Sequence, residues 1–170
     1  MIRSFFSSIL FYLFFILFQT AILSNITILP AVPDLMLIMT LYISLHNGCM
    51  LGQTTGFTSG LMMDFLSAGP LGLNSLIRTI LGYVFGLFSK TLNTTGFFLP
   101  ALYGFTATII KSILLLVISF FFPNGVVTYS LFSYVFLFEL AANTILTPLL
   151  FSFLNIFSNI LLTKPGVSLS

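Results

Sequence analysis

Charged side chains are almost absent from this chain of 170 residues, and no other feature limits the fold as strongly. Five Lys or Arg and three Asp or Glu residues make up 5% of the chain, whereas hydrophobic residues make up 58%. A soluble domain normally carries about 25% charged residues to solvate its surface. In lipid, each backbone polar group must be satisfied internally, which favours helices. The composition therefore predicts an all-α polytopic membrane protein.

The apolar runs predict six transmembrane helices in a single domain, residues 1–170. A crossing helix needs ~20 residues. Residues 33–66 would form one helix of about 50 Å, which is too long for a bilayer. Asn47-Gly48 is a strong turn signal, so we expect two helices there. The predicted spans are 5–23, 33–47, 49–66, 70–90, 97–122 and 127–147.

The last predicted span is followed by more apolar sequence. Pro148 is expected to kink or end the sixth helix. Beyond it, polar residues recur at Ser152, Asn155 and Asn159. This period is typical of an amphipathic segment at the membrane surface over residues 149–162, or of a kinked continuation of the helix.

The basic residues outside the apolar runs indicate the topology. With six spans, Arg3, Lys90 and Lys164 lie on one face of the membrane, and the opposite loops contain no Lys or Arg. With five spans, the same residues divide between both faces. The positive-inside rule therefore favours six spans with both termini cytoplasmic. Asp34, directly after Pro33, is then expected at the outer start of the second helix, at the positive end of its dipole.

The run over 5–23 is longer than the apolar core of a signal peptide, and no clear small-residue cleavage site follows it. We interpret it as a retained first span.

Glycine recurs at every fourth position of the third predicted helix and twice on the fourth. Such faces let two backbones approach closely, which stabilises helix pairs in lipid. The glycine spacing predicts close packing between helices of this chain or, alternatively, a surface that binds another subunit. The glycines concerned are Gly48, Gly52, Gly56, Gly60, Gly82 and Gly86.

Four charged residues lie inside predicted spans: Asp64, Arg78, Lys111 and Glu139. Each costs several kcal/mol in lipid unless it is paired or faces water. Their signs cancel, and Lys111 and Glu139 are expected at one depth near the midplane, whereas Arg78 reaches Glu139 only if their helices are neighbours. Along the helix axis, Asp64 is expected about 10 Å closer to the outer membrane surface than Arg78. The interpretations are a structural ion-pair network, a substrate or proton pathway, or a contact to a partner helix.

The composition argues against several function classes. The chain has no basic stripe for nucleic acid. A metal site needs several converging ligands, and the chain offers one histidine, His46, and one cysteine, Cys49. We interpret His46 as a helix-end residue. No nucleophile, base and acid occur together, so we expect no enzyme activity, no catalytic residue and no cofactor; a membrane enzyme that uses two carboxylates stays the weakest alternative.

Short motifs between residues 33 and 90, about a third of the chain, resemble the MreD family of bacterial rod shape-determining membrane proteins. The order of these motifs is specific as a set. One departure is the loop after the fourth helix, often richly basic in the family, which has only Lys90 here. The motifs are Pro33-Asp34-Leu35, Gly56-Phe57, Gly60-Leu61, Asp64, Pro70-Leu71-Gly72-Leu73, Gly82-Tyr83 and Gly86.

The resemblance implies a non-enzymatic scaffold subunit of the cell-elongation (rod) complex in the bacterial cytoplasmic membrane. Such proteins bind the bitopic protein MreC and act with MreB, RodA and a transpeptidase in peptidoglycan synthesis. Membrane lipid is the other expected contact, and nucleic acid is not. Candidate partner-contact residues are Pro33, Asp34, Leu35, Gly52, Gly56, Gly60, Asp64, Pro70, Leu71, Gly72, Gly82 and Tyr83.

The resemblance also implies a fold similar to the substrate-binding subunits of energy-coupling-factor vitamin transporters, with six helices and an outward pocket. Asp64 and the Pro70-Leu71-Gly72 turn are then expected at the outer rim. The alternative function is a vitamin-type binding subunit of a transporter. The chain has no Trp and its outer loops are poor in polar side chains. Because ligand pockets usually need aromatic walls and convergent polar groups, the scaffold is favoured.

Overall fold

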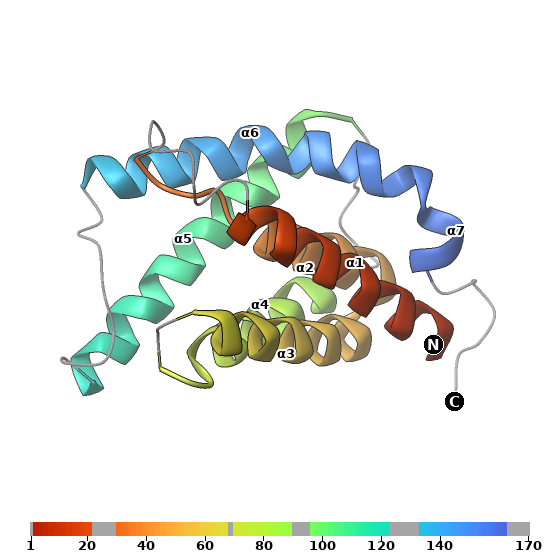
Figure 1. The fold of residues 1–170 in the computed structure, drawn as a ribbon. Coiled ribbons are helices and arrows are strands. Elements are labelled where there is room, and N and C mark those ends of the chain that lie inside the picture. The colour runs from red at the N-terminus through yellow and green to blue at the C-terminus, as the bar shows by residue number, and fades with distance from the viewer. Residues whose placement is uncertain (1, 22–29, 68–69, 90–95, 123–132, 163–170) are drawn as a thin grey trace.

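The computed structural model describes residues 2–21, 30–67, 70–89, 96–122 and 133–162 (Figure 1). Within these ranges every regular element is helical, which confirms the all-α prediction, and each predicted span contains a helix. The helices are α1 (Ile2–Ala21), α2 (Leu35–Asn47), α3 (Cys49–Leu66), α4 (Leu73–Leu87), α5 (Phe98–Phe121), α6 (Tyr134–Ile156) and α7 (Ser158–Leu161).

The described helices differ in whether they reach across a bilayer. Three are long and apolar enough to cross: α1 over Arg3–Ala21, α5 and α6. Helices α2 and α4 are apolar but contain only 13 and 15 residues. At 1.5 Å per residue they extend about 20 and 22 Å, less than the ~30 Å of a hydrocarbon core. The ends of α2 and α4 can therefore lie below the membrane surface.

Helix α2 is the buried centre of the fold. Its residues from Leu35 to Leu45 are all buried, and it contacts α1, α3, α4, α5 and α6. A helix that is apolar on every side lies either in lipid or among other helices, and the burial of α2 shows that it lies among other helices. From the sequence, Asp34 is expected at the outer start of this helix. Asp34 does cap α2, but it is only 5% exposed, so this start lies inside the protein.

The turn between α2 and α3 is where the sequence predicts it. Helix α2 ends at Asn47, α3 begins at Cys49, and Gly48 between them has φ +86°. Only glycine adopts this conformation without strain from a Cβ. The Gly48 N–H donates to the Ser44 carbonyl at 2.9 Å, which closes α2.

The glycine face of α3 packs against α4, and the two helices lie side by side (Figure 1). A Cβ added to Gly52 would lie 2.5 Å from the carbonyl oxygen of Gly82, and one added to Gly56 would lie equally close to that of Arg78. Gly60 meets Ser75 and Gly86 meets Cys49 in the same way. The face is therefore covered by the chain's own next helix and is not open to another subunit.

Pro148 does not end the sixth helix. Helix α6 continues through it to Ile156, and the four-residue α7 follows at once. Residues 127–132 of the predicted span lie outside the described residues. Neighbouring helices can make a proline tolerable inside a membrane helix. Helix α7 meets the α2–α3 turn, where Asn47 Nδ2 donates to the Leu161 carbonyl at 3.2 Å.

Candidate functional site

The carboxylate of Asp34 is the centre of a buried charge cluster. As the N-cap of α2 it accepts a hydrogen bond from the Leu37 N–H at 3.0 Å, which satisfies a free donor at the helix start. Two cations reach the same carboxylate from other helices. Arg78 Nη2 of α4 lies 3.0 Å from Oδ1, and Lys111 Nζ of α5 lies 2.8 Å from Oδ2. Asp34 thus joins the start of α2 to the second turn of α4 and to the middle of α5.

Lys111 connects Asp34 to a second carboxylate. Its Nζ lies 2.7 Å from Glu139 Oε1 of α6, and a common depth of the two residues permits this contact. Arg78 pairs with Asp34 and has no salt bridge to Glu139. The four side chains are at most 17% exposed and carry two charges of each sign. Buried charges are tolerated when they are paired with opposite charges, and each charge of this neutral cluster has such a partner. Among the described residues, the buried Nη1 of Arg78 has no hydrogen-bond partner.

Asn143 of α6 connects the cluster to its surroundings. Its Oδ1 accepts from the Asp34 backbone N–H at 2.9 Å, and its Nδ2 donates to Thr108 Oγ1 at 3.1 Å. The amide is fully buried. Sequence reasoning did not single out Asn143, although an amide inside an apolar run is itself a signal of an internal hydrogen bond.

Asp64 has a different role from the other charges of the predicted spans. Its Oδ2 accepts from the backbone N–H groups of Gly72 and Ser75 at 3.0 and 3.1 Å. Its Oδ1 accepts from the backbone N–H and the side-chain amide of Asn74 at 3.0 and 2.9 Å. Among the described residues it forms no salt bridge. Asp64 therefore lies outside the ion-pair cluster: this carboxylate, 1% exposed, caps α4, where the helix dipole favours an anion.

Replacing Asp64 with alanine is expected to lower stability by about 1–3 kcal/mol per donor group left buried without a partner. Asp64→Asn retains an oxygen that can accept hydrogen bonds, so it should lose less stability than Asp64→Ala. The midpoint of thermal unfolding in detergent measures both effects. Thr54→Ala is the control, because its exposed hydroxyl bonds only within α3. An Asp64→Ala midpoint equal to that of this control would contradict the capping role.

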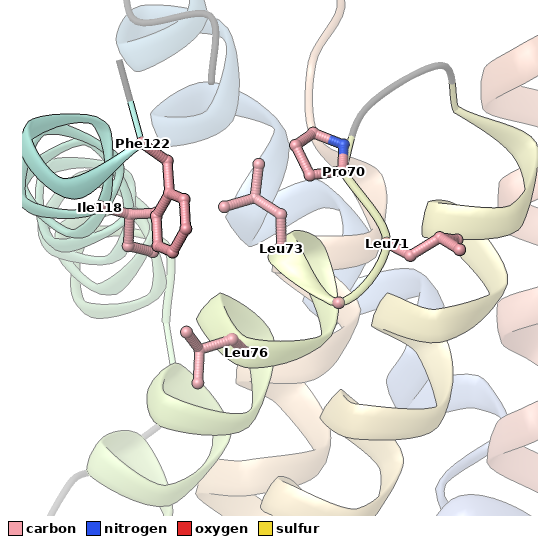
Figure 2. A pocket seen from close by; sticks show the side chains of 7 residues that line it. Pro70, Leu71, Leu73, Leu76, Ile118 and Phe122 are labelled. Atoms are coloured by element: carbon pink, nitrogen blue, oxygen red, sulfur yellow. The ribbon is translucent and has the colours of Figure 1, made fainter. Parts of the chain in front are cut away.

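An apolar cleft opens between the start of α4 and the end of α5 (Figure 2). Its volume is about 470 Å³. Figure 2 shows Leu73 and Leu76 on one side, pointing toward Ile118 and Phe122 on the other. No charged side chain lines it. The lining residues are Pro70, Leu71, Gly72, Leu73, Leu76, Ile118 and Phe122.

The candidate partner-contact residues divide into a buried set and an exposed set. The exposed ones are Pro70 and Leu71, in the lining of the cleft, and Tyr83 on the outside of α4; Gly72 is partly exposed. Only the exposed set is accessible to another molecule. The buried ones are Pro33, Asp34, Leu35, Gly52, Gly56, Gly60, Asp64 and Gly82.

The chemistry of the site is that of packing and ion pairing. Within the described ranges, no three His, Cys, Asp or Glu side chains converge as a metal site would require. His46 Nδ1 lies 2.8 Å from the Tyr42 carbonyl, at the end of α2. The carboxylates of Asp34 and Glu139 are held by cations, and that of Asp64 by N–H donors.

Comparison with known proteins supports one family. A family model described as "rod shape-determining protein MreD" matches residues 1–157. No curated protein and no solved structure matches the chain.

Proposed function

Because the chain belongs to the MreD family of rod shape-determining membrane proteins, we propose that it is a non-enzymatic scaffold of the bacterial cell-elongation complex. In this role it holds an MreC-like single-span protein beside MreB, RodA and a transpeptidase during peptidoglycan synthesis. A scaffold needs an accessible surface and no reactive group. The buried carboxylates fit this role, because each is bound to cations or N–H donors.

The observation that carries the proposal is the position of the Pro70–Leu73 motif. Most other motif residues are buried, so their role is to pack the helices of this chain against one another. Pro70 and Leu71 are exposed and line the apolar cleft. In lipid an exposed apolar side chain is ordinary, but a concave apolar surface offers a helix the close packing that drives association there. We assign the partner's membrane helix to this cleft.

The proposal includes six membrane crossings, both termini in the cytoplasm of a bacterial inner membrane, and a fold like that of vitamin-transporter binding subunits. Six main helices in the described ranges support it, together with the buried position of the short α2. The distribution of Arg3, Lys90 and Lys164 supports the orientation.

Filling the cleft should release the partner. Leu76→Trp places a larger side chain between α4 and α5, and co-purification of the MreC-like protein is expected to fall about tenfold or more, as for the loss of an interface hot spot. Leu87→Trp is the matched control, because Leu87 lies on the same helix at similar exposure, 56% against 51%, outside the cleft. Both variants should insert at parental levels. Equal recovery of the partner with both would exclude the cleft as its site.

The cleft volume also favours a second candidate, a small-molecule binding subunit of a transporter. Ligand pockets occupy roughly 300–1,000 Å³, and the cleft falls in this range. This candidate predicts a co-purifying small ligand and an ATPase-driven coupling module in place of the cell-wall enzymes. Mass spectrometry of the native complex separates the two candidates.

A further inference from the structure

A second cavity lies at the opposite end of α5 from the apolar cleft. Its volume is about 670 Å³, and it is formed by the end of α2, the start of α5 and the second half of α6. Helix α5 has 24 residues and extends about 36 Å, which is more than the ~30 Å of a hydrocarbon core. The cleft and this cavity therefore lie near opposite surfaces of the membrane. The lining residues are His46, Gly96, Phe97, Pro148, Phe151, Ser152 and Asn155.

The lining of this cavity combines apolar rings with polar side chains. Phe97, Pro148 and Phe151 supply the apolar part. The polar part consists of His46 with Ser152 and Asn155, and no Asp, Glu, Lys or Arg occurs among the described residues of the lining. Ligand sites typically combine apolar walls with a few polar groups that orient the ligand. A cavity with this lining suits an amphipathic molecule.

Asn155 and Ser152 offer hydrogen-bond donors to such a ligand. Asn155 Oδ1 accepts from Tyr42 Oη at 2.9 Å, so the oxygen of the amide is already bound and its Nδ2 carries two N–H donors. Among the residues that the structure describes, neither Nδ2 of Asn155 nor the Ser152 hydroxyl forms a hydrogen bond. Both side chains are exposed, and they lie three residues apart on one face of α6. A group that accepts hydrogen bonds can therefore contact both.

The depth of the cavity identifies the class of ligand. Helix α2 ends here at Asn47, α5 begins at Phe98 and α6 ends at Ile156. The period of polar residues at Ser152 and Asn155 is also typical of a segment at the membrane surface. At this level of a bilayer the abundant amphipathic molecules are the glycerophospholipids, and the phosphodiester oxygens that these lipids carry can only accept hydrogen bonds.

We propose that this cavity binds one glycerophospholipid of the adjacent leaflet. Asn155 Nδ2 and Ser152 Oγ donate to the phosphodiester oxygens, and an acyl chain lies against the rings of Phe97 and Phe151. Hydrogen bonds to an ionised acceptor are about twice as strong as those between neutral groups. Because the lining holds no charged side chain, the site recognises the phosphodiester and does not select the rest of the headgroup. The proposal is independent of the scaffold function, which concerns the cleft at the other surface.

Native mass spectrometry of the full chain, purified and delipidated in detergent, tests the site. The protein is titrated with phosphatidylglycerol, phosphatidylethanolamine or diacylglycerol that carry the same acyl chains. One molecule of either phospholipid should remain bound, with similar affinity. Diacylglycerol lacks the phosphodiester and should bind at least about tenfold more weakly, as expected for the loss of hydrogen bonds to a charged group.

Asn155→Asp is the variant that tests the donors. It keeps a side-chain oxygen for Tyr42, but it removes both N–H donors and places a negative charge beside the phosphodiester. The affinity for the first phospholipid should fall about tenfold or more. Asn159→Asp is the matched control, because it adds the same charge at an exposed position of α7 outside the cavity lining. It should bind phospholipid like the parent.

Ser152→Phe tests the cavity by filling it. Leu149→Phe is its control, since Leu149 lies on the same helix, is 55% exposed and is outside the lining. Ser152→Phe should lose the bound phospholipid, and Leu149→Phe should retain it, with both thermal midpoints close to that of the parent.

Three results would overturn the proposal. Equal losses in Asn155→Asp and Asn159→Asp would mean that the added charge acts from anywhere on this surface. Parental binding in both Asn155→Asp and Ser152→Phe would place the lipid elsewhere. Diacylglycerol that binds as tightly as the phospholipids would exclude recognition of the phosphodiester. The Leu76→Trp experiment reports on the cleft alone, so the scaffold function can stand if the lipid site fails.

Discussion

Replacing Asp34 with leucine is expected to remove most of the folded protein from the membrane. The substitution takes the carboxylate from Arg78 and from Lys111 and leaves the cluster with excess positive charge. Orphaning a buried charge costs about 3–5 kcal/mol in soluble proteins, and losing an N-cap adds about 1 kcal/mol. Since the whole stability of a typical domain is about 5–15 kcal/mol, this loss is a large share of it.

The yield of monodisperse protein after detergent extraction, with its thermal midpoint, measures the effect. Asp34→Asn separates the two contributions, because asparagine caps a helix as well as aspartate but carries no charge. The yield and the thermal midpoint of Asp34→Asn should fall between those of the parent and those of Asp34→Leu. The double variant Lys111→Met with Glu139→Leu should lose less yield and less thermal stability than Asp34→Leu, although it changes two residues. If Asp34→Leu melts like the parent, the charge cluster does not hold α2 in place.

A single methyl group on the glycine face is expected to separate α3 from α4. In Gly52→Ala the new Cβ meets the Gly82 carbonyl, and in Gly82→Ala it meets the backbone of Gly52. Backbone atoms cannot move aside as the end of a flexible side chain does. Overpacking typically costs about 1–3 kcal/mol, and we expect the upper end of this range for each variant.

A double-mutant cycle tests whether the two glycines share one contact. Once the helices are separated by one methyl group, the second should cost little, so the double variant should be clearly more stable than the sum of the single losses predicts. Thermal unfolding in detergent gives the values. Thr54→Leu adds a larger group to the exposed face of α3 and should leave the midpoint unchanged. Strictly additive losses would argue against a shared contact.

The helices could be predicted from the sequence because lipid requires satisfied backbone groups, and long apolar runs then leave few alternatives. The break at Asn47-Gly48 followed from turn chemistry, and Gly48 has the expected positive φ. The four-residue glycine spacing predicted close backbone contact. It could not identify the neighbour, because small residues favour approach by a helix of the same chain or of another.

The buried position of Asp34 could not be predicted, because each span was assumed to cross the whole bilayer. With that assumption the start of α2 belongs at the rim. Helix α2 extends only about 20 Å, and Asp34 at its start is 5% exposed, so its first turn is covered by other parts of the chain. The partner of Arg78 depends on which helices are neighbours, and apolar periodicity carries no such information. Lys111 and Glu139 could be paired because a hairpin fixes their relative depth.

The arrangement of the four buried charges also bears on how the chain enters the bilayer during synthesis. The first four helices contain Asp34 and Arg78, which pair with each other, and the last hairpin contains Lys111 and Glu139, which do the same. Each half can therefore leave the insertion machinery with these charges already neutralised, without waiting for the other half. On this basis we expect the bond between Asp34 and Lys111 to form last, when the two halves dock laterally in the lipid.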